Sequence, residues 1–85
     1  MLFIFADEAD RGFWMQNTLI PLDIAYITAA GKVANVVLGK PLDQTTLRST
    51  APSKYVLELK AGDAKRLGVK AGVHIAIPKE LRSKD

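Results

Sequence analysis

The sequence of 85 residues has no cysteine and a single histidine, His74. Without cysteine neither a disulfide nor a thiolate metal site can reinforce the fold, and no ligand-spaced cluster accompanies His74, so we expect no metal site. No phosphate-cradling glycine motif is present: Gly62 and Gly68 are typical of backbone turns around a helix, and we expect no cofactor.

Long hydrophobic runs are also missing. No apolar stretch approaches the roughly 20 residues of a membrane-spanning helix, and the apolar residues 1–5 lack the basic start and the length of a signal peptide. We therefore expect no membrane insertion, and the compartment stays open.

The formal net charge of +3 hides an asymmetry along the chain. Residues 1–24 sum to −3, residues 25–53 to +2 and residues 54–85 to +4. The lysines are spread singly, and no aromatic residues alternate with them as in nucleic-acid stacking platforms. We therefore expect a solvated surface that keeps a small protein soluble, and no nucleic-acid partner.

Hydrophobic periodicity predicts a single β-rich domain over residues 1–78 and a charged flexible tail over residues 79–85. Strands are expected at 1–5, 20–28, 33–38, 55–59 and 73–77, a helix at 61–67, and exposed loops at 6–12 and 39–54. The fold class is mainly β with one short helix, and an α+β arrangement is the alternative.

The segment 13–24 holds the only tryptophan, a proline inside an apolar run, and an aspartate where an apolar strand should continue. Here Trp14 could form a stacking platform, while Asn17, Thr18 and Asp23 could fix hydroxyl or amide groups of a small polar ligand such as a sugar or peptide. Alternatively, Trp14 fills the core, Asn17 and Thr18 satisfy turn backbone, and Asp23 accepts N–H bonds from a loop. A carboxylate fully engaged by backbone N–H groups would argue against ligand binding.

Glu58 and His74 are secondary candidates, because each is expected on the outward face of its strand. If the two strands are neighbours, the side chains could meet as an acid/base couple; otherwise they belong to the surface. Asp23 and Glu58 are the only carboxylates inside ordered elements that could act as a hydrolytic pair. No residue is assigned a catalytic role.

The run Trp14-Met15-Gln16-Asn17-Thr18-Leu19-Ile20-Pro21-Leu22-Asp23-Ile24 resembles the hallmark of the bacterial and archaeal domain-of-unknown-function family 192. The family's second motif is resembled by Val56-Leu57-Glu58-Leu59, Ala61-Gly62, Ala64, Arg66-Leu67-Gly68 and Gly72. Met1-Leu2-Phe3 resembles the strand that precedes the first motif. The chain departs from the family in having Gly72-Val73 where members commonly show Gly-Asp, and members usually begin a few dozen residues earlier.

The resemblance implies a small β-sandwich or open barrel with a small helix, in a family whose members are often exported and have no established activity. Loss of an edge strand would leave unpaired backbone groups, so we expect a homodimer through an exposed strand edge. Our leading hypothesis is a non-enzymatic binding or interaction module with a shallow polar groove for a small polar ligand or peptide. The alternatives are a hydrolytic enzyme that uses paired carboxylates and a purely structural accessory domain of an envelope assembly.

Overall fold

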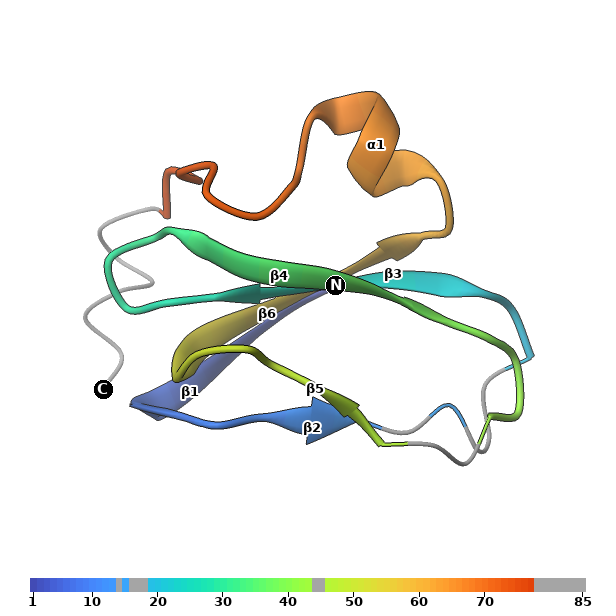
Figure 1. Cartoon of the computed structure of the whole chain (residues 1–85), viewed down its shortest axis with the longest axis horizontal. Helices are drawn as coiled ribbons and strands as arrows, with labels where there is room; N and C mark the ends of the chain where they lie inside the picture. Colours follow the sequence, from blue (N-terminus) through green and yellow to red (C-terminus); the bar gives the residue numbers. More distant parts are fainter. Residues whose placement is uncertain (14, 16–18, 44–45, 78–85) are drawn as a thin grey trace.

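The centre of the molecule is a four-stranded antiparallel sheet in the order β1-β6-β3-β4. It appears in a computed structural model that describes residues 1–13, 15, 19–43 and 46–77 (Figure 1). The sheet consists of β1 (Leu2–Ala9), β3 (Leu22–Ile27), β4 (Val33–Gly39) and β6 (Ser53–Lys60). A separate ribbon pairs β2 (Gly12–Phe13) with β5 (Leu47–Arg48), and the helix is α1 (Asp63–Leu67).

The helix and the ribbon lie on opposite sides of the central sheet (Figure 1). Under the ribbon, Ile24, Tyr26 and Val56 form one buried cluster together with Met15. On the helix side a second cluster contains Ile27, Val33, Tyr55 and Ile77. The prediction of a mainly β fold with one short helix is therefore confirmed, and the antiparallel sheets do not close into a barrel.

The hairpin and the helix form where the sequence predicts them. Gly31, with φ of 89°, turns the chain from β3 into β4. At the end of α1, Gly68 adopts a left-handed conformation with φ of 76°, and the Val69 N–H donates to the Ala64 carbonyl at 2.8 Å. This is the glycine-terminated helix end that the sequence indicates.

Both predicted loops contain strand, and those predictions are wrong. β1 continues to Ala9, because a shift in register after Ile4 allows Ala9 to pair with Ser53 although Asp7 and Glu8 between them are exposed acids. The segment 39–54 contains β5 and the first residues of β6. A two-residue strand is too short to produce a periodic pattern.

The alternation of residues 55–59 predicts a strand with one open face, and for the first half of β6 this prediction is wrong. β6 lies between β1 and β3, and both of its faces are covered: Val56 faces the ribbon side and Tyr55 the helix side, and each is at most 1% exposed. A central strand with layers on both faces need not show a polar face.

The strand predicted at 73–77 is reduced to an isolated bridge between His74 and Lys32. The Val33 N–H donates to the Val73 carbonyl, and the Ile75 N–H to the Gly31 carbonyl, both at 2.8 Å. The segment therefore pairs only with residues at the turn of the β3–β4 hairpin. This contact is too short to form a strand. Ile75 and Ile77 nevertheless pack in the helix-side cluster, as their spacing predicts. The predicted tail, 79–85, lies outside the described residues.

Candidate functional site

Asp23 lies in β3 with its side chain on the helix side of the sheet. Its cross-strand partners are Leu38 on β4 and Leu59 on β6. One carboxylate oxygen, Oδ2, accepts the backbone N–H of Gly62 at 2.9 Å and that of Ala64 at 3.0 Å. These are donors at the start of α1, where a helix has no internal partners for its N–H groups.

The N-cap residue, Gly62, has no side chain with which to cap the helix, and its φ is 95°. Asp23 supplies the missing acceptor from a strand 39 residues away along the chain. A negative charge at this end of a helix is also favoured by the peptide dipoles. Asp23 thus attaches α1 to β3, as the structural interpretation of this residue predicts.

The second oxygen of Asp23, Oδ1, is not used in this contact. Asp23 is 9% exposed, and among the described residues no buried side-chain oxygen or nitrogen lacks a partner. Since both hydrogen bonds from backbone N–H groups end on Oδ2, Oδ1 reaches the surface. The backbone N–H groups at the start of α1 therefore engage one of the two carboxylate oxygens of Asp23.

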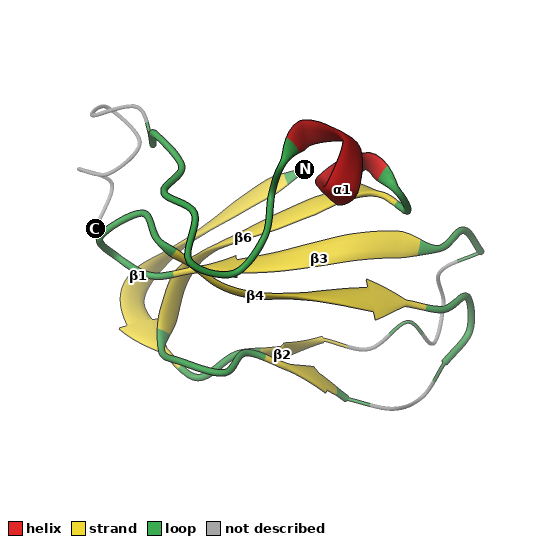
Figure 2. Ribbon diagram, turned by 45° about the horizontal axis from the view of Figure 1, so that its top comes forward, coloured by secondary structure: helices red, strands yellow, loops and turns green. Residues whose placement is uncertain are grey.

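Asp23 also lines a groove between α1 and the edge strand β4, which we call the α1–β4 groove. Its volume is about 750 Å³. The lining residues are Asp23, Val36, Leu38, Ala61, Gly62, Ala64, Lys65, Gly68, Val69 and Lys70. Figure 2 shows α1 over the sheet near the end of β6, with β3 next to β6 and β4 beyond it. An apolar floor with one convergent carboxylate is the usual composition of a binding site.

The rim of the α1–β4 groove is basic and partly apolar. Lys65 and Lys70 are exposed, and Leu38 is 54% exposed. Asp23, the one acidic side chain in the lining, already lies against the N–H groups of α1. The lining therefore combines two ammonium groups with a single carboxylate.

Of the four primary candidates, the structure places only Asp23. Trp14, Asn17 and Thr18 lie outside the described residues. Between them, Met15 is 1% exposed in the ribbon-side cluster, and its N–H donates to the Asp43 carbonyl at 3.0 Å. This part of the block contributes to the core.

The secondary candidates are not brought together. Glu58 is opposite Ile24 in the β3–β6 ladder, whereas His74 bridges Lys32 beyond the hairpin end of β3. Asp23 and Glu58 point to opposite faces of the sheet, since Asp23 is opposite Leu59 and alternate residues of a strand change face.

Glu58 instead affects Tyr26, a fully buried residue on the same face. Burial, and to a smaller extent the charge of Glu58, raises the pKa of Tyr26 to about 12. The Tyr26 hydroxyl donates to the Leu47 carbonyl of β5 and thereby links the sheet to the ribbon. This arrangement is structural, because the phenol is neutral and its proton is already donated.

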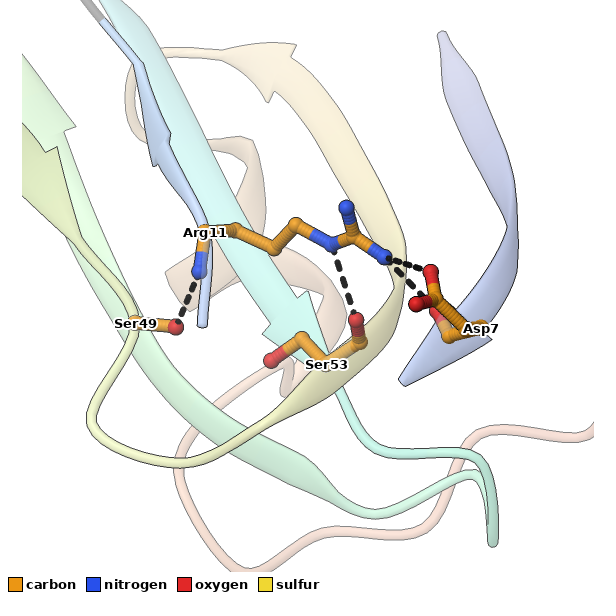
Figure 3. Close-up of polar contacts among 4 residues, drawn as sticks. All are labelled: Asp7, Arg11, Ser49 and Ser53. Atoms are coloured by element: carbon orange, nitrogen blue, oxygen red, sulfur yellow. Dashed lines mark hydrogen bonds and ion pairs between the residues drawn. The ribbon is translucent and has the colours of Figure 1, made fainter. Parts of the chain in front are cut away.

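Sequence reasoning missed a polar cluster around Arg11 (Figure 3). The guanidinium donates to the Ser53 carbonyl at 3.0 Å and to Asp7 Oδ1 at 3.2 Å, and it lies 3.8 Å from the centroid of the Phe5 ring. The Arg11 N–H donates to Ser49 Oγ at 3.0 Å. A single arginine four residues after Asp7 in an acidic stretch was the available signal. The cluster holds the corner between β1 and β2 against the start of β6.

Over the described residues, the chain is a small antiparallel β domain with a short helix and an apolar groove beside an edge strand. The chain belongs to domain-of-unknown-function family 192, described as "Uncharacterized ACR", whose sequence profile matches residues 1–77. No curated protein matches the chain.

Two solved structures are similar. A protein of unknown function from Novosphingobium aromaticivorans is 37% identical with a TM-score of 0.84, and the match covers 91% of this chain and 56% of that one. A provisionally assigned transcription regulator from Sinorhizobium meliloti is 39% identical with a TM-score of 0.81, covering 87% and 58%. The chain therefore spans less than two thirds of the length of these relatives.

Proposed function

We propose that this protein is a non-enzymatic binding module whose site is the α1–β4 groove. The observation that carries the proposal is the position of the Asp23 carboxylate: Oδ2 accepts two N–H groups at the start of α1, Oδ1 accepts neither of them, and Asp23 lines the groove. A carboxylate held in this way orients an acceptor toward a ligand without a change in conformation. The ligand is a small polar molecule or a peptide with an apolar part and an N–H or O–H donor.

The size and composition of the groove support this proposal. A volume of about 750 Å³ lies within the usual range for small-molecule sites, roughly 300–1,000 Å³. Val36 and Val69 in the lining and Leu38 at the rim provide apolar contact, whereas the Asp23 carboxylate provides a directional hydrogen-bond acceptor. Because the lining has few polar groups, we expect shape complementarity and the burial of apolar surface to contribute most of the binding free energy.

The alternative of a hydrolytic enzyme has less support. Hydrolysis by two carboxylates needs both groups beside one scissile bond, roughly 5–9.5 Å apart. Asp23 and Glu58 point to opposite faces of the sheet, so a substrate at Asp23 is separated from Glu58 by the sheet itself. In a purely structural accessory domain, Asp23 would cap α1 in the same way. The ligand screen described next distinguishes this alternative from a binding module.

The test is a screen for amide chemical-shift changes on ¹⁵N-labelled protein with capped amino acids, dipeptides and monosaccharides. We expect shifts at Val36, Leu38 and Ala64, around the groove. Leu38→Glu should abolish them, because it places a charge at the apolar rim. Leu67→Glu is the matched control, since Leu67 is 55% exposed and Leu38 54%, and Leu67 is not among the groove residues.

A response that is spread over the surface, or that survives Leu38→Glu, would contradict the assignment of the site. No response at millimolar concentrations, with the fold intact by the dispersion of the spectrum, would favour the accessory-domain alternative.

A further inference from the structure

β4 is an edge strand whose outer side is only partly covered. At the start of β4, the Val33 N–H donates to the Val73 carbonyl, and the Val33 carbonyl accepts the Gly72 N–H. The hydroxyl of Thr50 donates to the Ala34 carbonyl. From residue 36 to 39, no described segment forms a ladder with the outer side of β4. Such an edge is a template for another extended chain.

The uncovered edge is continuous with the α1–β4 groove. Val36 and Leu38 belong to the edge strand and also line the groove. They are opposite Ala25 and Asp23 in the β3–β4 ladder, so their side chains lie on the helix side of the sheet. A strand added along β4 would place every second side chain on this same side, at the mouth of the groove.

The positive charge of the groove rim favours a ligand with acidic side chains. Lys65 and Lys70 are exposed at the rim. An extended chain with acidic side chains on the helix side would bring carboxylates to these ammonium groups. A second copy that paired through β4 in antiparallel fashion would instead carry its own Lys65 and Lys70 to the same side of the joined sheet.

We propose that the edge of β4 and the α1–β4 groove bind an extended peptide segment of a partner protein, with acidic and apolar side chains on its groove face. The segment pairs with residues 36–39 by backbone hydrogen bonds, and its apolar side chain covers Leu38. Four paired residues extend about 13 Å, so the recognised segment is short. This inference rests on the proposed function and specifies its ligand.

The probe is the capped peptide acetyl-Glu-Thr-Val-Thr-Glu-amide, in which Glu, Val and Glu share one face. We expect saturable shifts at Val36, Leu38 and Ala64, and about tenfold weaker binding of acetyl-Lys-Thr-Val-Thr-Lys-amide, because two favourable ion pairs become repulsive. Equal binding of the two peptides would overturn the inference.

Reversing the charge of the two lysines on the protein provides a second test of the inference. The variant carrying Lys65→Glu and Lys70→Glu should lose the glutamate peptide and gain the lysine peptide. Lys60→Glu is the control: Lys60 is also exposed, but it is opposite Leu22, on the other face of the sheet. A preference that does not invert in the double variant, or that inverts equally in the control, counts against the inference.

Backbone pairing is tested by N-methylation. In an antiparallel ladder, alternate N–H groups point toward the neighbouring strand, so methylating either the two Thr amides or the Val and second Glu amides blocks one set. We expect one methylated peptide to lose binding and the other to keep it. If both bind as the parent does, the segment does not add to the sheet.

These outcomes separate the inference from the proposed function. A groove response to small capped ligands without any response to the peptides refutes the extended-segment occupant and leaves the binding module intact. Sedimentation of the protein alone identifies a second copy as the occupant. A dimer that Leu38→Glu dissociates, and that the glutamate peptide does not displace, would overturn the inference in favour of the homodimer.

Discussion

Removing the Asp23 carboxylate should destabilise the domain by a predictable amount. Asp23→Ala leaves two N–H groups at the start of α1 without their acceptor. The N–H of buried Ala64 loses its partner with little access to water, which costs about 1–3 kcal/mol, whereas exposed Gly62 can turn to solvent at about 0.5–1 kcal/mol. Relief of the desolvation of Asp23 itself offsets part of this, so we expect a loss of about 2 kcal/mol.

Asp23→Asn should cost about half as much, because the amide oxygen can accept the same N–H groups without the charge. The free energy of unfolding is measured by urea denaturation followed by far-ultraviolet circular dichroism, with Asp10→Ala, a substitution of an exposed acid, as the control. Amide hydrogen exchange should accelerate at Ala64 and Arg66 in the Asp23 variants. An Asp23→Ala protein within about 0.5 kcal/mol of the wild type, with unchanged exchange in α1, would refute the capping role.

Three further results are expected. The stability contributed by Tyr26 should be present below pH 10 and lost as the pH rises toward 12, by about 2–3 kcal/mol; in alkaline unfolding, the advantage of wild type over Tyr26→Phe should shrink over that window. Gly31→Ala should cost about 1–2 kcal/mol more in thermal unfolding than Gly72→Ala, because both have φ of 89° but only at Gly31 would a Cβ lie 2.9 Å from the Ile75 carbonyl oxygen. Arg11→Lys should lower stability by about 1–2 kcal/mol in urea, because an ammonium cannot reproduce the planar set of donors; an unchanged midpoint would contradict this.

The elements that could be predicted from the sequence are those with strong local signals. β3 and β4 follow from β-branched runs around Gly31, and α1 from its charges and Gly68. β2 and β5 could not be predicted, since two-residue strands depend entirely on their long-range pairing. β6 was expected to have an open face because neither the ribbon nor its position between two strands can be deduced from local alternation.

The candidate site was predictable only in part. An aspartate within an apolar strand indicated a carboxylate with compensating partners, and Asp23 has them. The groove was not predictable, since its lining residues have no unusual local pattern. They are brought together by the packing of α1 on β6 and β3, next to β4. Pairing of Glu58 with either His74 or Asp23 depended on strand order and register, which the sequence does not specify.

The Asp23 contact also joins the two segments of this chain that resemble the family motifs. The first motif ends with Asp23 and Ile24, and the second contains Gly62 and Ala64, whose N–H groups Asp23 accepts. Gly62 has φ of 95°, which favours glycine, and Ala64 is buried at 4% exposure, which favours a small side chain. At Gly62 a side chain would meet no atom within 4 Å but would strain the positive φ, whereas at Ala64 a larger side chain would have to displace its buried surroundings. One carboxylate therefore fixes the helix and also lines the groove, so the requirements of the fold and of the proposed site coincide at the same three residues.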